Sequence, residues 1–105
     1  DVVQTPRILD DRQSAWAQYT VCLKDSEERS RVAVYMREVG IPSMVYYKKP
    51  MHLQEAFIGK QVKAVSCAMT EKLCGKCLSL PFHPYLEEEM IEEVCACVLK
   101  GVSNG

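Results

Sequence analysis

The stretch LCGKCLSLPFHPYLEEEMIEEV, residues 73–94, contains the breaks that decide the fold around it. A short apolar run at residues 78–80 ends at Pro81, which has no N–H group to continue a strand. Three glutamates then open an apolar-periodic segment, where the positive end of a helix dipole favours them. We predict a strand at residues 78–80 and an amphipathic helix at residues 86–99, ended by Gly101. Its predicted buried stripe comprises Met90, Ile91, Val94, Cys95 and Val98.

Two further helices are predicted upstream. Asp25 and Glu28 form a capping-box-like start, and Gly40 is the residue type that most readily ends a helix. The apolar positions between them recur every three to four residues, at Val32, Tyr35, Met36 and Val39. Residues 66–77 form the other predicted helix, with one side made of Met69, Leu73 and Cys77.

Two further strands are predicted from β-branched and aromatic residues. One covers residues 15–24 and the other residues 43–47, and a loop with one helical turn after Pro50 follows the second. Strands and helices therefore alternate along the chain, which predicts a small two-layer α/β sandwich (α+β). We expect a single domain over residues 1–105, with residues 1–14 as an extended lead-in and residues 15–102 as the folded part.

Composition excludes several classes of protein. Of 105 residues, 48% are hydrophobic and 26% charged, which is typical of a globular chain. The net charge of -1 argues against a nucleic-acid binder, which would carry a basic patch. No apolar run approaches the ~20 residues of a membrane span, and the start of the chain does not resemble a signal peptide. We expect no nucleic-acid or membrane partner.

The six cysteines allow three interpretations. A redox Cys-x-x-Cys pair needs a helix N-terminus, but Cys74 and Cys77 fall at a predicted helix C-terminus. A zinc site needs about four convergent ligands, whereas Cys95 and Cys97 point to nearly opposite sides of their helix. His52 and His83 stand outside zinc-finger spacing. We therefore predict structural free thiols without metal in a reducing, cytoplasmic compartment, and a metal or redox module remains the weaker alternative.

Two long phrases carry a family resemblance. GIPSMVYYKKPMHLQEAF, residues 40–57, and LSLPFHPYLEEEMIEEV, residues 78–94, occur in the order found in one group of enzymes, as does the lead SAWAQYTV, residues 14–21. The chain thus resembles the C-terminal domain of the DegT/DnrJ/EryC1/StrS sugar aminotransferases, from about residue 14 to residue 102. That resemblance implies the small domain of a fold-type I aminotransferase, with a short, mainly antiparallel sheet and about three helices.

The resemblance also implies a chemistry. Such enzymes use pyridoxal 5'-phosphate (PLP) to aminate a nucleotide-linked keto-sugar, usually with glutamate as amino donor, and they act as homodimers. Their products serve cell-surface polysaccharides or secondary metabolites. The Schiff-base lysine belongs to a large N-terminal domain that is missing here, and no lysine of this sequence lies in a matching motif. We therefore expect no catalytic residue and no bound PLP in this chain, which should be inactive alone.

Four residues are candidates for contact with the sugar nucleotide. Tyr46 and Tyr47 match an aromatic pair of the family, although many members have His at the first position. Alternation along a strand predicts that the two rings face different ways. His52 and Gln54 match the family's His-Leu-Gln phrase. The competing hypothesis is a stand-alone α/β module that binds a protein partner through exposed apolar surface.

Overall fold

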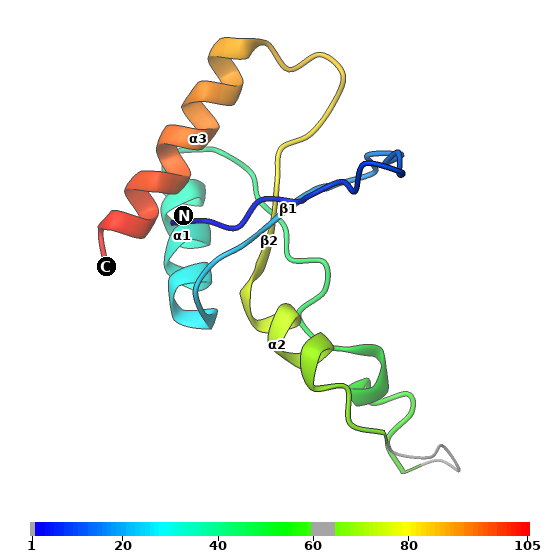
Figure 1. Ribbon diagram of the computed structural model, residues 1–105. Coiled ribbons are helices and arrows are strands. Elements are labelled where there is room, and N and C mark those ends of the chain that lie inside the picture. Colours follow the sequence, from blue (N-terminus) through cyan, green and yellow to red (C-terminus); the bar gives the residue numbers. More distant parts are fainter. Residues whose placement is uncertain (1, 60–64) are drawn as a thin grey trace.

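Within its described residues, the chain folds into three α-helices around a two-stranded antiparallel sheet (Figure 1). The computed structural model describes residues 2–59 and 65–105. Its elements are β1 (Tyr19–Cys22), α1 (Ser26–Glu38), the 3-10 turn η1 (Met51–Leu53), α2 (Ala68–Lys76), β2 (Cys77–Leu80) and α3 (Glu88–Ser103). Strand β1 pairs with β2 so that Tyr19 lies opposite Leu80 and Cys22 opposite Cys77. The predicted small α+β fold is therefore confirmed.

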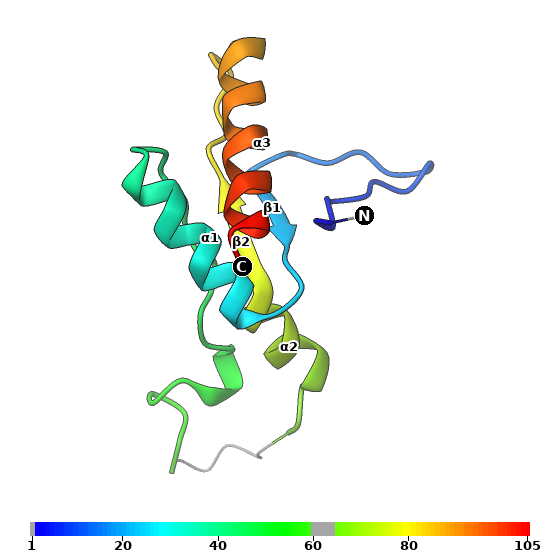
Figure 2. The ribbon, with the colours of Figure 1, turned by 90° about the vertical axis from the view of Figure 1, so that its left-hand side faces the viewer.

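The core lies where α1 and α3 pack on the two strands. Helices α1 and α3 run side by side in both views of the ribbon (Figures 1 and 2). Residues from all four elements meet there and are buried, namely Val21, Leu23, Val32, Met36, Leu78, Cys97 and Val98. Leu23 lies just after β1, and its N–H donates to the carbonyl of Lys76 at 2.9 Å. Burial of these apolar side chains is the main stabilising term of the fold.

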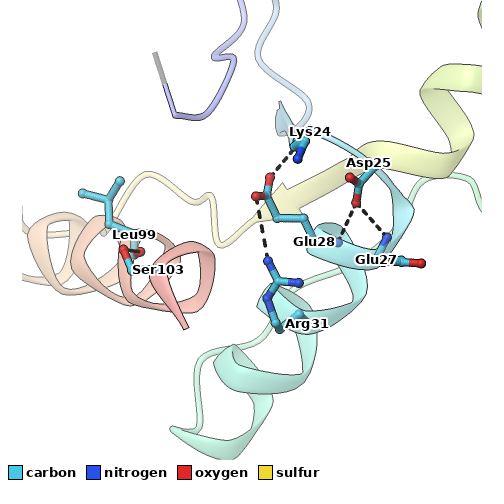
Figure 3. A network of polar contacts seen from close by, with 7 residues as sticks. All are labelled: Lys24, Asp25, Glu27, Glu28, Arg31, Leu99 and Ser103. Atoms are coloured by element: carbon cyan, nitrogen blue, oxygen red, sulfur yellow. Dashed lines mark hydrogen bonds and ion pairs between the residues drawn. The ribbon is translucent and has the colours of Figure 1, made fainter. Parts of the chain in front are cut away.

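Helix α1 begins at the predicted cap (Figure 3). The Asp25 carboxylate accepts hydrogen bonds from the N–H groups of Glu27, at 3.1 Å, and Glu28, at 2.9 Å. The bond from Glu28 is the chief reason that the pKa of Asp25 lies below its ordinary value. The Glu28 carboxylate reaches back one residue further than in a standard capping box and accepts from the Lys24 N–H at 2.8 Å. These bonds pair two N–H groups in the first turn of α1, which have no partner within the helix, and the Lys24 N–H just before it.

Helix α1 also ends where the sequence predicts. Gly40 has φ +81, a conformation that side chains other than glycine rarely adopt. Its N–H donates to the carbonyl of Arg37, and the Ile41 N–H donates to that of Met36. This pair of bonds is a Schellman motif, which turns Ile41 back against the core.

Helix α3 corrects the prediction in two respects. It continues through Gly101 to Ser103, and its buried residues are Cys97, Val98 and Gly101. Cys95 is exposed, so the predicted stripe was wrong there by about half a turn. Met90 and Ile91 are also exposed, because α1 covers only the C-terminal half of α3 and the first turns project beyond it (Figure 1).

The predicted strand at residues 43–47 was wrong. Only Met44 pairs with the sheet, through two backbone bonds with Ser79 of 2.7 and 3.0 Å. Pro42 removes a donor on one side of this bridge, and a turn begins at Tyr46 on the other. The first strand is shorter than predicted too, since Trp16 has φ 48 and breaks the extended run.

Helix α2 lies away from the core at the opposite end from the first turns of α3 (Figure 1). None of its residues is buried, so the predicted apolar side with Met69 and Leu73 is exposed. Cys77, assigned to the same side, instead opens β2. No helix among residues 2–59 and 65–105 is long and apolar enough to cross a membrane.

Candidate functional site

The segment from Gly40 to Gln54 carries all four candidate residues. The glycine turn after α1 directs this segment across the sheet, where Met44 is bound to Ser79. The chain then leaves the sheet at Tyr46 and enters η1 after Pro50, which is buried. A fixed backbone at Met44 followed by an exposed loop is typical of binding segments, because loops at strand ends hold polar groups near solvent.

Tyr46 and Tyr47 pack against each other, contrary to the predicted opposite orientation. Their ring centroids lie 5.5 Å apart at an interplanar angle of 64°, an edge-to-face arrangement. Strand alternation does not apply because the backbone turns at this point. Tyr46 is 38% exposed and Tyr47 68% exposed, so both hydroxyl-bearing rings remain accessible from solvent. The Cys77 thiol donates to the Tyr46 carbonyl at 3.8 Å and ties the base of the pair to β2.

Tyr46 lines a cavity of about 300 Å³, which we call the Tyr46 cavity. It lies between the chain before β1, residues 42–44, and the end of β2. Its polar groups come from Gln18, Ser43, Tyr46 and Ser79. The Ser79 hydroxyl is already hydrogen-bonded to Thr20 at 2.7 Å. Phe82 also lines it, so the cavity combines hydroxyl- and amide-bearing residues with an aromatic one.

His52 and Gln54 make contacts within the protein. The Nε2 atom of His52 lies 2.9 Å from a carboxylate oxygen of Glu71 and thereby joins η1 to α2. The amide of Gln54 donates to the Lys49 carbonyl at 3.0 Å and closes the loop around η1. Neither residue is among the described residues that line the Tyr46 cavity. The structure thus brings together the two tyrosines, and places His52 and Gln54 in the neighbouring loop as its hydrogen-bonding supports.

The sequence analysis missed an aromatic cluster beside the cavity, of which Phe82 is the member that lines it. Trp16 stacks on Tyr19 with a centroid distance of 5.7 Å, and Phe82 lies 6.2 Å from Trp16 and 6.3 Å from Tyr19. The sequence signal for Phe82 was its place after Pro81. The next residue, His83, accepts a hydrogen bond at Nδ1 from the Tyr85 N–H at 3.2 Å.

Comparison with known proteins identifies the family of this fold. The family model of the DegT/DnrJ/EryC1/StrS aminotransferases matches residues 1–99. The chain belongs to that family. A pleiotropic regulatory protein from Geobacillus stearothermophilus is 36% identical over 90% of this chain and 24% of its own length. The UDP-2-acetamido-2-deoxy-3-oxo-D-glucuronate aminotransferase of Pseudomonas aeruginosa is 31% identical over 91% of this chain and 25% of its own.

The fold of this family member is also found in a crystal structure. A DegT DnrJ EryC1 StrS aminotransferase from Brucella abortus superimposes with a TM-score of 0.81 at 36% identity. That comparison covers 94% of this chain and 26% of the Brucella chain. The present chain therefore spans about a quarter of the length of the relatives it matches.

The described residues around the Tyr46 cavity of this family member do not by themselves fit a PLP site. PLP requires a lysine for its aldehyde and an acid for its pyridine nitrogen. The described residues that line the Tyr46 cavity include neither a lysine nor a carboxylate. Lys48 lies outside that cavity, and Lys60 and Lys63 are outside the described residues.

The thiols have a structural setting in this fold. All six cysteines are free, with Cys74 in the last turn of α2 and Cys77 at the start of β2. Burial raises the pKa of the Cys77 thiol, and burial likewise raises that of Cys97. A raised pKa opposes thiolate chemistry, because the thiolate is the reactive form. Cys77 and Cys97 therefore act as small core residues.

Proposed function

We propose that this chain is the small-domain portion of a sugar aminotransferase that uses PLP, with the missing large domain supplying the cofactor lysine. The family match over residues 1–99 carries the proposal. It is supported by the P. aeruginosa relative, whose name describes an aminotransferase acting on a UDP-linked keto-sugar. A nucleotide-linked keto-sugar is thus the proposed substrate class, with glutamate as donor. The proposed setting is the cytoplasm, and a homodimer is the proposed assembly.

In this proposal the tyrosine pair contacts the substrate. Tyr46 faces its cavity, and Tyr47 offers the more exposed hydroxyl. Phenolic hydroxyls both donate and accept, so they can bind sugar hydroxyls or phosphate oxygens. The edge-to-face contact holds the two rings in one arrangement before substrate arrives, which lowers the entropic cost of binding. His52 and Gln54 then contribute by shaping the loop, with any direct contact to substrate made from its exposed side.

The exposed apolar residues at the start of α3 fit the same proposal. Tyr85, Met90 and Ile91 lie where α1 does not cover the helix. A large domain packed there would bury them. A stand-alone interaction module would expose the same surface. The two hypotheses make different predictions for the longest polypeptide that carries this sequence. It should transfer amino groups if the chain is part of an aminotransferase, and should not if the chain is an interaction module.

The test is steady-state kinetics on that longest polypeptide with a UDP-linked keto-sugar and glutamate. Tyr47→Phe removes only the hydroxyl, and we expect kcat/KM to fall about ten- to hundredfold, as for one lost hydrogen bond to a charged group. Tyr46→Phe should have a comparable or smaller effect. Tyr35→Phe is the matched control, because Tyr35 packs against the core and is not among the residues that line the Tyr46 cavity.

Two outcomes would count against the proposal. If the unmodified polypeptide transfers no amino group to any nucleotide-linked keto-sugar, the function is wrong. If it does, but Tyr46→Phe and Tyr47→Phe both retain full kcat/KM, the tyrosine pair is not part of the site. For the 105-residue chain, borohydride treatment with PLP should leave no stoichiometric pyridoxyl-lysine by mass spectrometry. Such an adduct at a single lysine would show that the chain holds the cofactor itself.

A further inference from the structure

A second, larger cavity shares a wall with the Tyr46 cavity. Pro42, Ser43 and Met44 line both, so this short segment separates them. The larger one measures about 680 Å³ and lies between α1, residues 40–48 and Leu78. We call it the arginine cavity, because Arg29 and Arg37 line it together with Lys48.

The positions of the cations follow from the helix. Arg29, Ala33 and Arg37 lie four residues apart and so share one face of α1. Eight residues of helix separate the two arginines by about 12 Å along the axis. Lys48 approaches from the opposing segment, after the tyrosine pair. The cavity thus has positive groups at both ends and on two of its walls.

Nothing among the described residues neutralises these cations. No aspartate or glutamate occurs among the described residues that line the cavity. The basic residues in salt bridges of the described chain are Arg12, Arg31, Lys49 and His52, which are all elsewhere.

The remaining walls are apolar. They comprise Ala33, Val34, Ile41, Pro42, Met44, Val45 and Leu78. A cavity of this volume is of the size that holds metabolites. Inorganic anions alone would leave the apolar walls without a partner, whereas a neutral apolar molecule would gain nothing from the three cations.

We propose that the arginine cavity binds an organic anion of metabolite size. Its phosphate or carboxylate group pairs with Arg37 and Lys48, and its apolar body lies against Val34, Ile41 and Met44. Arg29, about 12 Å from Arg37 along the helix axis, adds to the positive potential of the cavity. This site is distinct from the proposed sugar site, because Tyr46 lines only the smaller cavity. The proposal does not depend on aminotransferase activity.

Phenyl phosphate is a suitable probe because it joins a dianion to an apolar ring. We would titrate it into the ¹⁵N-labelled 105-residue chain and follow amide shifts. Shifts should saturate and should be confined to residues 29–37 and 40–48. Arg37→Gln and Lys48→Gln should each weaken binding by about tenfold, as for one lost charge-assisted contact. Arg12→Gln removes the same charge from the exposed lead-in and should leave binding unchanged.

Inorganic phosphate and phenol separate the two halves of the ligand. Each should bind at least tenfold more weakly than phenyl phosphate if both the cations and the apolar walls contribute. Equal binding of inorganic phosphate would overturn the apolar part of the proposal. Absence of saturable shifts, or an equal loss in Arg12→Gln, would overturn the site. If sedimentation instead shows a dimer that Arg37→Gln dissociates, the occupant is an acidic segment of a second copy and the small-ligand proposal is wrong.

Discussion

Helix α3 is held by buried apolar contacts, whereas helix α2 is held by polar contacts near the surface. Helix α3 contacts α1 along a seam in which Val32 and Met36 meet Cys97, Val98 and Gly101. Helix α2 and the η1 loop form an arm without a buried residue on either helix. The arm is tied by His52 to Glu71, Gln54 to the Lys49 carbonyl, and Lys49 to Glu55. The seam thus supplies stability, and the arm presents candidate binding residues from a polar, exposed framework.

The largest effect should come from emptying the seam. Met36→Ala removes a side chain with 0% exposure and should lower the free energy of unfolding by about 2–5 kcal/mol. Met69→Ala on α2 is the matched control, since Met69 is 68% exposed and should cost less than about 0.5 kcal/mol. Urea unfolding followed by circular dichroism measures both. If the two variants lose similar free energy of unfolding, then Met69 is buried in solution and the proposed difference between the seam and the arm is wrong.

The next effect tests how closely the two helices approach. A Cβ at Gly101 would lie 3.2 Å from the Cα of Val32, so Gly101→Ala must push α3 away from the α1 backbone. We expect a loss of about 1 kcal/mol or more, despite the higher helix propensity of alanine. Gly75→Ala on α2 meets only the Ser26 Cβ at 3.9 Å. That control should gain up to about 1 kcal/mol. A destabilising Gly75→Ala together with a neutral Gly101→Ala would mean that the close packing lies at α2 and not between α3 and α1.

The Cys-x-x-Cys pair spans the boundary between arm and core. Cys74 is half-buried on α2, whereas Cys77 is buried at the start of β2 and burial raises its pKa. Iodoacetamide at pH 7.5 should therefore alkylate Cys74 at least about tenfold faster than Cys77. Mass spectrometry of digested samples over time gives both rates, and labelling in urea should remove the difference. A Cys74–Cys77 disulfide in the native chain would restore the redox interpretation.

Sequence reasoning succeeded where one residue type had a single strong preference. Asp25 at the start of α1 and Gly40 at its end were located from side-chain chemistry alone. It failed in part for α3. The helix and buried Val98 were predicted correctly, but contact with α1 buries Cys97 and Gly101 and leaves Cys95 exposed. A glycine inside a helix is also ambiguous in sequence. Gly101 ends nothing and instead admits the neighbouring backbone.

The candidate site shows the same division. Tyr46, Tyr47, His52 and Gln54 were chosen from a family phrase, which gives residue types but no geometry. The failure at residues 43–47 changed the relation of the two rings, since a strand would have separated them and the turn brings them into contact. Phe82 and the arginine cavity were not predicted. Both arise from residues far apart in sequence that only the packing of residues 40–48 against α1 and the sheet brings together.

The smallest expected effect concerns the tie between η1 and α2. The His52 and Glu71 side chains are 22% and 42% exposed, so solvent screens their 2.9 Å contact. A double-mutant cycle with His52→Ala and Glu71→Ala should give a coupling of about 0.5 kcal/mol and no more than 1. The same cycle on Lys49 and Glu55, 4.0 Å apart and more exposed, should give a value near zero.

We expect the arm to open while the seam stays folded, so this cycle needs a measurement of local opening rather than of global unfolding. Native-state hydrogen exchange resolves that opening at the Leu53 and Gln54 amides, which donate to Pro50 and Met51 within the η1 loop. Loss of the His52–Glu71 contact should speed exchange there and leave the Val98 amide in α3 unchanged. If exchange speeds up equally at the Leu53, Gln54 and Val98 amides, the arm and the seam unfold together. An arm that opens independently would need contacts beyond these polar ties to hold His52 and Gln54 in a fixed binding geometry.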